Sequence, residues 1–201
     1  MSTFVVGLTG GLASGKSTVL EFFRKLGVDT FSADHVVHQL MAKDGLAYTT
    51  ITNHFGENIL DAEKNIDRTQ LRTIIFNSPE KKHWLENYLH PLVRTSLLEQ
   101  CRKSTSPYIV VEIPLLAESK TPFEWINRIL VVDSDERTQQ LRAQNRSGIS
   151  KSDSRHILNQ QATREKRNEI ANDIISNHGN LSELEHQVKT LHNKYLEISS
   201  A

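Results

Sequence analysis

Residues 4–18 read FVVGLTGGLASGKST, and this stretch decides the fold. A short apolar run leads directly into a glycine-rich turn, and the residues after the turn have the apolar spacing of a helix. Residues 10–17, GGLASGKS, match the phosphate-loop pattern GxxxxGK[ST]. Such a loop binds phosphate because glycines let backbone amides curl around an anion, and the helix N-terminus adds positive potential. The alternative is an ordinary glycine-rich turn, but here the strand, the helix and every fixed position of the pattern occur together.

The end of this pattern has the chemistry that a nucleoside triphosphate with magnesium requires. Lys16 can reach the β and γ phosphates, and the Ser17 hydroxyl is placed to ligate a magnesium ion that bridges them. Thr18 adds a hydroxyl near the α phosphate. We therefore expect the nucleotide to contact Gly11, Leu12, Ala13, Ser14, Gly15, Lys16, Ser17 and Thr18.

Short apolar runs typical of buried strands recur along the chain, separated by helical patterns. They lie at 3–9, 28–31, 108–113, 128–133 and 173–177. Apolar strands that alternate with helices indicate a parallel sheet covered on both faces. We predict an α/β fold of the P-loop NTPase type, with three layers, a first helix that Gly27 ends, and a core at 3–34 and 107–200.

The segment at about 35–105 is too long for a simple crossover between strands and reads mostly as helix. We interpret it as a helical insertion that binds substrate at the carboxyl ends of the strands. Ser78 and Pro79 look like the cap and first residue of its long helix, which Pro91 should kink or end. The sequence has no repeats and no Gly/Ser linker, so we expect one domain over 1–201.

Composition narrows the partners and the compartment. The 201 residues include 24 Lys and Arg and 24 Asp and Glu, so no net charge attracts the molecule to nucleic acid or to an anionic membrane. Cys101 is the single cysteine and cannot form an internal disulfide. No run reaches the roughly 18 apolar residues of a membrane span. We expect a cytoplasmic protein, monomeric or with weak self-association.

The sequence lacks the motifs of several P-loop classes. A GTPase switch should carry DxxG and NKxD, and neither string occurs. A motor or helicase should have a hydrophobic strand that ends in paired acids, whereas residues 108–116 read YIVVEIPLL. A small-molecule kinase remains. Another nucleoside or nucleotide kinase and a non-enzymatic NTP-sensing module stay open as alternatives.

A kinase of this kind needs an arginine-rich lid that excludes water from the transferring phosphoryl group. Residues 134–167 contain more basic than acidic side chains, and we place the lid at about 142–167. Arg142 and Arg146 share one helix face at i and i+4 and are the candidate catalytic arginines. The alternative for each arginine is a solvated helix face.

Asp34 directly follows the second strand-like run, so it should lie at the carboxyl edge of the sheet. A carboxylate there can accept the proton of an attacking hydroxyl. Asp before an amphipathic segment is also a preferred helix N-cap, and the residues alone leave both possibilities open. His35 and His38 have helical spacing, but no nearby ligand completes a metal site.

Taken together, these segments resemble one family, dephospho-CoA kinase, from about residue 4 to residue 180. The similar stretches occur in the family's order: GLTGGLASGKS (7–17), FSADHVV (31–37), DRTQLRTIIF (67–76), WLENYLHPLV (84–93), EIPLLAES (112–119) and QATREKRNEIANDIISNHG (161–179). The resemblance implies ATP as phosphoryl donor, Mg2+ as cofactor, and dephospho-CoA as the substrate whose ribose 3′-hydroxyl is phosphorylated. It also implies that the insertion holds the CoA precursor.

The resemblance also implies roles for single residues. It favours Asp34 as the catalytic base and Arg142 and Arg146 as lid residues, and it places Asn177 near the nucleotide. Arg68, His90 and Gln161 become candidate substrate contacts, with a helix-capping residue, a residue held at a kink, and an ordinary surface residue as the respective alternatives. Three positions depart from the family pattern: Ala13 replaces a glycine, and Ser32 and Asn172 replace aspartates. We expect the loop to close unless position 13 requires a positive φ.

Overall fold

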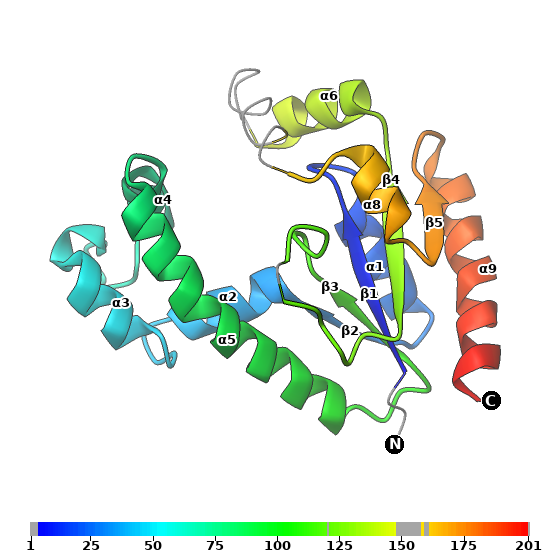
Figure 1. Cartoon of the computed structure of the whole chain (residues 1–201), viewed down its shortest axis with the longest axis horizontal. Coiled ribbons are helices and arrows are strands. Elements are labelled where there is room, and N and C mark those ends of the chain that lie inside the picture. The colour runs from blue at the N-terminus through cyan, green and yellow to red at the C-terminus, as the bar shows by residue number, and fades with distance from the viewer. Residues whose placement is uncertain (1–3, 120, 148–157, 159–160, 201) are drawn as a thin grey trace. The chain divides into compact units, whose positions relative to one another are not determined.

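The computed structural model describes residues 4–119, 121–147, 158 and 161–200 (Figure 1). The chain divides into two compact units, which we call unit 1 (Met1–Ser32 and Gln100–Ala201) and unit 2 (Ala33–Glu99). Each unit is described by itself below. The expectation of one domain with a helical insertion at about 35–105 stays a prediction.

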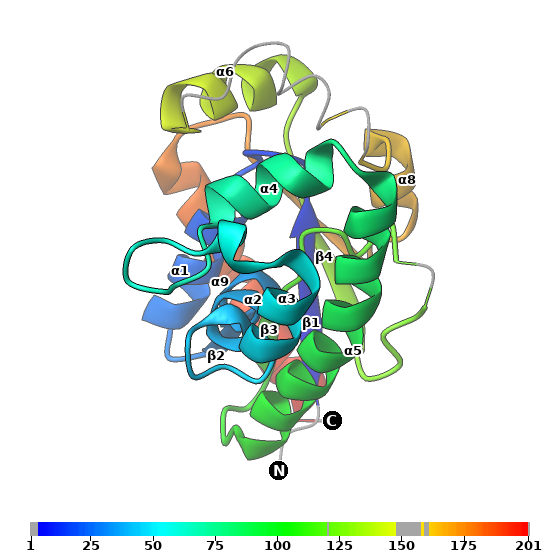
Figure 2. The same ribbon diagram turned by 90° about the vertical axis from the view of Figure 1, so that its left-hand side faces the viewer.

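Unit 1 is built on a parallel sheet, which in the described part of the chain has five strands in the order β2-β3-β1-β4-β5. They are β1 (Val5–Gly10), β2 (Asp29–Ser32), β3 (Ile109–Glu112), β4 (Arg128–Asp133) and β5 (Asp173–Ser176). Each overlaps a run predicted as a strand, so the α/β class and the parallel sheet are confirmed. β1 lies between β3 and β4 (Figure 2), so the loop after β1 leaves the middle of the carboxyl edge, where open parallel sheets bind ligands.

One face of this sheet packs on α1 (Lys16–Lys25) and α9 (Leu181–Ser199). Val6 and Leu8 of β1 are fully buried in the core between them. Phe23, Tyr108 and Tyr195 meet there, with ring centroids 5.5–6.3 Å apart. The aromatic contacts anchor both helices to the sheet and hold the start of α1 beside the end of β1.

The segment between β3 and β4 packs closely on the other side of β1 through Gly7. A Cβ at Gly7 would lie 2.9 Å from Ile126 Cδ1 and 3.2 Å from Leu116 Cδ2. Beyond β4 the chain forms α6 (Glu136–Ser147) and α8 (Arg164–Glu169). Asp135 accepts a hydrogen bond from Thr138 N (2.8 Å) and so satisfies one first-turn amide of α6.

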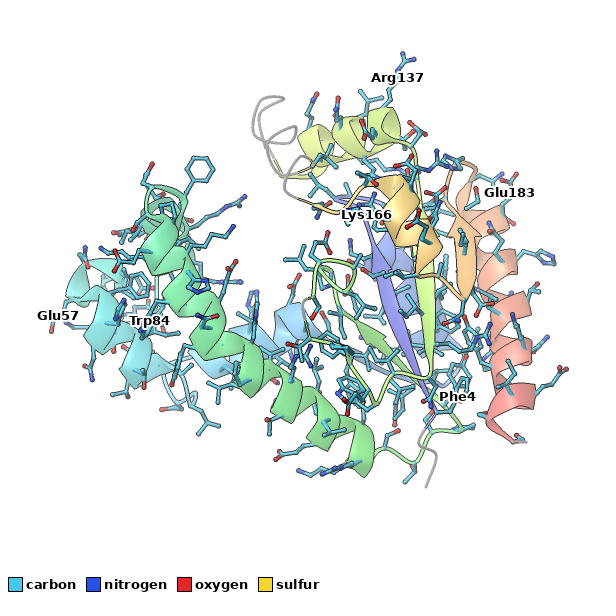
Figure 3. The ribbon with its side chains drawn as sticks, in the orientation of Figure 1. Phe4, Glu57, Trp84, Arg137, Lys166 and Glu183 are labelled. Atoms are coloured by element: carbon cyan, nitrogen blue, oxygen red, sulfur yellow. The ribbon has the colours of Figure 1, made fainter. Side chains whose placement is uncertain are left out.

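Unit 2 is helical. It contains α2 (Ala33–Met41), α3 (Tyr48–Phe55), the 3-10 turn η1 (Glu57–Ile59), α4 (Arg68–Phe76) and α5 (Pro79–Lys103), the last of which extends into unit 1. Trp84 of α5 points toward α3 (Figure 3), where its ring stacks on His54 with centroids 3.5 Å apart. Asp67 caps α4 by accepting hydrogen bonds from Thr69 N and Gln70 N.

Helix α5 begins as the sequence predicts but does not end at Pro91. Ser78 Oγ accepts from Lys81 N at 3.4 Å, and Pro79 is the first helical residue. Of the two expected effects of Pro91, the end of the helix is wrong, because α5 continues to Lys103, and the kink stays a prediction. A proline inside a helix removes one hydrogen bond and crowds the carbonyl four residues earlier, at a cost of about 3 kcal/mol. The buried side chains of Leu89, Val93 and Leu97 on either side of it offset that cost and hold the helix.

Among the described residues, no helix combines the length and the apolar character needed to cross a membrane.

Candidate functional site

The phosphate loop has the backbone that its glycines predict. Gly15 caps α1 with φ 101°, in the left-handed region, and Gly10 has φ 157°. The loop is closed by a hydrogen bond from Ser14 N to the Gly11 carbonyl at 3.2 Å. No side chain caps α1 and no acidic residue lies in its first turn. The amide dipoles at this end therefore attract an anion from solution.

Ala13 also has a positive φ, at 52°. The sequence predicted that the loop would close unless position 13 required a positive φ. Position 13 does take this left-handed conformation, at a place where the family has glycine. The loop closes in spite of this, because alanine has a small side chain and can enter the left-handed region at a cost of about 1–2 kcal/mol.

We expect Ala13→Gly to stabilise the protein. Glycine removes the left-handed strain of about 1–2 kcal/mol but adds about 0.4–1 kcal/mol of chain entropy to the unfolded state, which leaves a gain of about 0–1.6 kcal/mol. Urea denaturation would measure it as a higher free energy of unfolding at an unchanged m value. A lower free energy of unfolding would contradict the strain assigned to Ala13.

Lys16, Ser17 and Thr18 form the first turn of α1. The Lys16 ammonium donates to the carbonyls of Gly10 (3.0 Å) and Gly11 (2.9 Å), so its charge lies over the loop. Ser17 is exposed and Thr18 lines a cavity beside the loop. The contacts of these residues with phosphates and a magnesium ion stay a prediction.

Two residues far away in the sequence hold the loop. Gln161 Oε1 accepts a hydrogen bond from Leu12 N at 2.9 Å, and Asn177 Nδ2 donates to the Ser14 carbonyl at 2.7 Å. Asn177 packs so tightly that a Cβ at Gly15 would lie 2.2 Å from its Nδ2. Gln161 and Asn177, predicted as ligand contacts, therefore contact the phosphate loop itself.

A cavity of about 440 Å³ opens beside the loop. Its lining combines loop residues, α6 residues and the segment that follows β5: Ala13, Gly15, Thr18, Arg142, Asn145, Asn177, Gly179, Leu181 and Leu184. Leu181 and Leu184 contribute apolar side chains to the lining, while Arg142 and the two asparagines supply polar groups. A cavity of this size and lining suits a nucleoside next to the phosphate site.

Among the lid arginines whose side chains are described, Arg142 lines the cavity. Its Nη2 donates to the Asn177 carbonyl at 3.3 Å, and its Nη1 is buried without a hydrogen-bond partner among the described residues. Arg146 lies on α6, but its side chain is outside the described part of the chain, as are residues 148–157, 159 and 160 of the expected lid. Arg137 points away from α6 into solvent (Figure 3).

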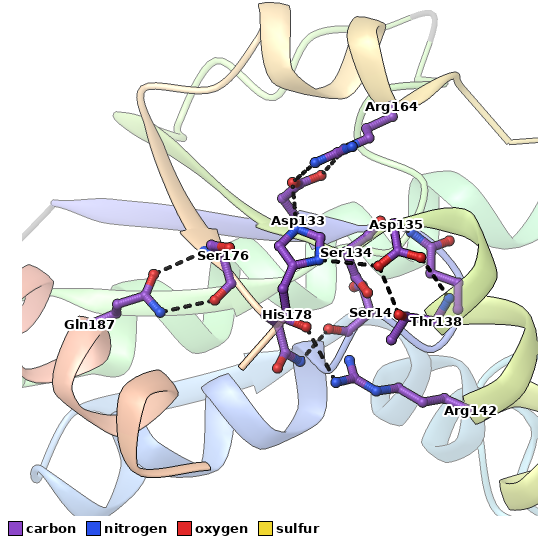
Figure 4. Close-up of polar contacts among 12 residues, drawn as sticks. Ser14, Asp133, Ser134, Asp135, Thr138, Arg142, Arg164, Ser176, His178 and Gln187 are labelled. Carbon is purple, nitrogen blue, oxygen red and sulfur yellow. Dashed lines mark hydrogen bonds and ion pairs between the residues drawn. The ribbon is translucent and has the colours of Figure 1, made fainter. Parts of the chain in front are cut away.

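The carboxyl end of β4 carries a charged cluster next to the loop (Figure 4). Arg164 donates to Asp133 through Nε (2.7 Å) and Nη2 (2.5 Å), and His178 lies 3.4 Å from Asp133 and 3.2 Å from Asp135. The hydrogen bonds from Arg164 hold the pKa of Asp133 below its usual value, although burial opposes them. Hydrogen bonds from the Thr138 amide and hydroxyl lower the pKa of Asp135 to about 2. The predicted lid residue Arg164 is thus engaged by a carboxylate.

The remaining predicted residues lie in unit 2. Asp34 is exposed and is the second residue of α2, two positions beyond the end of β2. Because α2 begins at Ala33, Asp34 does not precede the helix, and the N-cap alternative is wrong. Arg68 is the first residue of α4 and its guanidinium contacts the His38 ring. His90 is exposed on α5.

The sequence did not single out Gln139, which lies behind the phosphate loop. Its side chain is 1% exposed, donates to the Ser134 carbonyl at 2.7 Å, and would lie 2.5 Å from a Cβ at Gly11. Asp133, Asn145 and Gly179 were also missed. Asn145 and Gly179 occur in ordinary surface-like patterns, whereas Asp133 ends a run that was assigned only as a buried strand.

The match to a family model decides the identity. The model described as dephospho-CoA kinase matches residues 4–183. The chain belongs to the dephospho-CoA kinase family. Its activity is the ATP-dependent phosphorylation of dephospho-CoA.

Individual relatives agree with the family. A dephospho-CoA kinase of Coxiella burnetii is 43% identical over 194 residues, which cover 96% of this chain and 98% of that one. One of Shigella flexneri is 39% identical over 98% of this chain and 95% of its own length. Among solved structures, dephospho-CoA kinase from Campylobacter jejuni has a TM-score of 0.65 at 29% identity, covering 95% of this chain and 96% of the other.

A crystal structure of TT1252 from Thermus thermophilus is similar with a TM-score of 0.81 at 27% identity, covering 95% of this chain and 97% of the other. A shikimate kinase from Bacteroides thetaiotaomicron, at 16% identity and a TM-score of 0.55, shares the fold. The P-loop kinase fold predicted from residues 10–17 is therefore confirmed.

Proposed function

We propose that this site transfers the γ-phosphoryl group of ATP to the ribose 3′-hydroxyl of dephospho-CoA, giving ADP and coenzyme A. The observation that supports this most directly is the phosphate loop, tied by Gln161 and Asn177, beside a cavity of about 440 Å³ in a chain of this family. The phosphates bind over the first turn of α1, and the adenine base packs between the Leu181 and Leu184 side of the cavity and α6.

In the transfer, the 3′-oxygen forms a bond to the γ-phosphorus as the bond to the leaving ADP oxygen breaks. Asp34 accepts the proton of the 3′-hydroxyl, since an exposed carboxylate just beyond a strand end is open to an incoming alcohol. Lys16 and Arg142 stabilise the negative charge on the transferring group, which is the main source of catalysis in phosphoryl transfer. The unpartnered Nη1 of Arg142 supports this role, because a buried guanidinium N–H without an acceptor favours an anion beside it. Arg146 has the same role from the next turn of α6.

A magnesium ion, when bound, would supply charge neutralisation to the phosphates, and the hydroxyl at the start of α1 fits it. Ser17 is an exposed hydroxyl on the first turn of α1 and would hold the ion. The described residues contain no cluster of three or more His, Cys, Asp or Glu, so an ion held there would take most of its ligands from phosphate and water. Mg2+ binds in this way in other kinases.

Unit 2 supplies the acceptor site in this proposal, with Arg68 and His90 as substrate contacts and Gln161 at the phosphate loop. One chain carries all the proposed residues, which supports a monomer with at most weak self-association.

The thiol of Cys101 is buried and unpaired, and burial raises its pKa to about 11. An unreactive free thiol and ATP as donor support action in the cytoplasm, without nucleic acid or membrane as partner.

An acceptor panel tests this proposal. ADP release would be followed with ATP and Mg2+ in the presence of dephospho-CoA, AMP, CMP, adenosine or pantothenate, and the product identified by mass. We expect turnover with dephospho-CoA and a product heavier by one phosphate on the ribose. Omission of Mg2+ should stop the reaction. Preferred turnover of AMP or CMP would replace the acceptor by a nucleotide, and ATP binding without turnover of any acceptor would favour a sensing module.

A further inference from the structure

Helix α6, which carries Arg142 to the nucleotide cavity, has an unusual buried face. Among its described side chains, those of residues 136–145, the buried ones are Gln139 and Ala143. Its large apolar residue, Leu141, is 53% exposed. An alanine buries little apolar surface, so hydrophobic packing contributes little to the position of α6. The main buried contact of the helix is therefore a polar side chain, that of Gln139.

The amide of Gln139 lies between the residue that precedes Asp135 and the phosphate loop. Its Nε2 donates to the Ser134 carbonyl at 2.7 Å. A Cβ at Gly11 would lie 2.5 Å from its Oε1 and 2.7 Å from its Nε2. The orientation of the amide follows from the first contact, since a flipped amide would place Oε1 against the Ser134 carbonyl oxygen. The missing side chain of Gly11 makes the room that this amide occupies.

The Oε1 of Gln139 is buried and has no hydrogen-bond partner among the described residues. A buried amide oxygen in this state costs stability, and an apolar side chain of similar size would avoid the cost. The amide provides what an apolar side chain cannot, a bond of fixed direction at the start of α6. Gln139 therefore determines where α6 rests on the loop.

The position of α6 in turn determines where Arg142 points. Arg142 follows Gln139 by three residues, so the two are neighbours on the helix surface. Its Nη2 donates to the Asn177 carbonyl at 3.3 Å, and its buried Nη1 has no hydrogen-bond partner in the described part of the chain. A catalytic group misplaced by about 1 Å can cost roughly a hundredfold in rate. Small shifts of α6 should therefore affect turnover.

We propose that Gln139 is a positioning residue that holds α6 against Gly11 of the phosphate loop and thereby aims Arg142 at the transferring phosphoryl group. This inference rests on the proposed function, in which Arg142 stabilises the charge on that group. Gln139 acts from behind the loop, through Gly11 and Arg142, and is not itself a ligand of the nucleotide.

Steady-state kinetics on the full chain tests this role. Gln139→Leu removes the bond to the Ser134 carbonyl and should lower kcat roughly fivefold to a hundredfold, the range for a buried group that loses its partner. In an Arg142→Ala background the same substitution should change kcat less than about twofold, because residues that act as one unit are not additive. Gln140→Leu is the matched control, since Gln140 is a half-buried glutamine of the same helix.

Gln139→Glu gives a second readout, which also decides if Gln139→Leu does not fold. A protonated carboxyl group can donate to the Ser134 carbonyl as the amide does, whereas an ionised one cannot. The kcat of this variant, divided by that of the unaltered protein at the same pH, should therefore rise as the pH is lowered. The rise should begin above the ordinary pKa of about 4.3, because burial favours the neutral form. A ratio that stays constant with pH would overturn the role of this bond.

Two outcomes of the kinetics contradict the proposal directly. A kcat of Gln139→Leu equal to that of Gln140→Leu would overturn the positioning role, and equal losses with and without Arg142 would overturn its action through Arg142. If the unaltered protein does not phosphorylate dephospho-CoA, the proposed function fails separately, and the same variants are titrated calorimetrically with ATP. Weaker ATP binding in Gln139→Leu that disappears in the Arg142→Ala background would support the positioning role, and equal weakening in both backgrounds would overturn it.

Discussion

Asp34→Asn should lower kcat roughly a hundredfold to ten-thousandfold, the usual contribution of a positioned general base. Asparagine has nearly the same shape but cannot accept the proton of the 3′-hydroxyl. Because Asp34 is exposed, the change leaves no cavity and no buried group without a partner. KM for ATP should stay the same, since the phosphate loop is formed by other residues. The measurement is turnover of dephospho-CoA at saturating ATP and Mg2+.

Asp34 lies in the first turn of α2, so its carboxylate could serve only to stabilise the helix. The same variant distinguishes this role from that of a catalytic base. If the carboxylate only stabilises the helix dipole, Asp34→Asn should reduce stability by about 0.3–1 kcal/mol and leave kcat unchanged. Asp44→Asn is the control, because Asp44 is another exposed acid of unit 2. A kcat equal to that of Asp44→Asn would show that Asp34 is not the base.

Gly15→Ala should weaken ATP binding roughly thirtyfold to several-thousandfold. The new Cβ would lie 2.2 Å from Asn177 Nδ2, which must then give up its 2.7 Å bond to the Ser14 carbonyl. Left-handed strain at φ 101° adds about 1–2 kcal/mol to the about 1–3 kcal/mol of a lost buried hydrogen bond. Isothermal titration with ATP would measure the loss.

Gly27→Ala is a matched control for the backbone part of this effect. Gly27 also has a positive φ, 81°, but a Cβ there would meet nothing within 4 Å. It should cost about 1 kcal/mol of stability without changing ATP affinity. Equal ATP affinity in the two variants would mean that Asn177 does not hold the loop.

The strands and the phosphate loop could be predicted because their signals are local. An apolar run of 4–8 residues identifies a buried strand, and the spacing from Gly10 to Ser17 identifies the loop and the helix that follows. The cap of the long helix, Ser78 before Pro79, is local in the same way. The preference of proline for helix ends did not predict that α5 continues through Pro91. Packing of the buried residues on either side of Pro91 keeps the helix intact.

The rest of the site is made by contacts between distant residues, which no spacing rule encodes. Gln139 looks like one of several polar residues of a surface helix until β4 and the loop bury it against Gly11. Arg164 was grouped with the lid arginines by its charge, but its bidentate pairing with Asp133 requires the fold. The sequence shows that an alanine at position 13 would be strained if its φ were positive, but only the backbone dihedral shows that φ is positive there.

The central place of β1 has a consequence for biosynthesis. β1 is synthesised before every other strand of the sheet, yet its neighbours are β3 and β4, and the ties of its loop come from residues 149 and 163 positions later. At roughly 5–20 residues per second, the loop waits about ten to thirty seconds for Asn177 to leave the ribosome. A nascent chain shorter than this cannot complete its phosphate site. Retention on immobilised ATP would therefore separate finished chains from prematurely terminated ones.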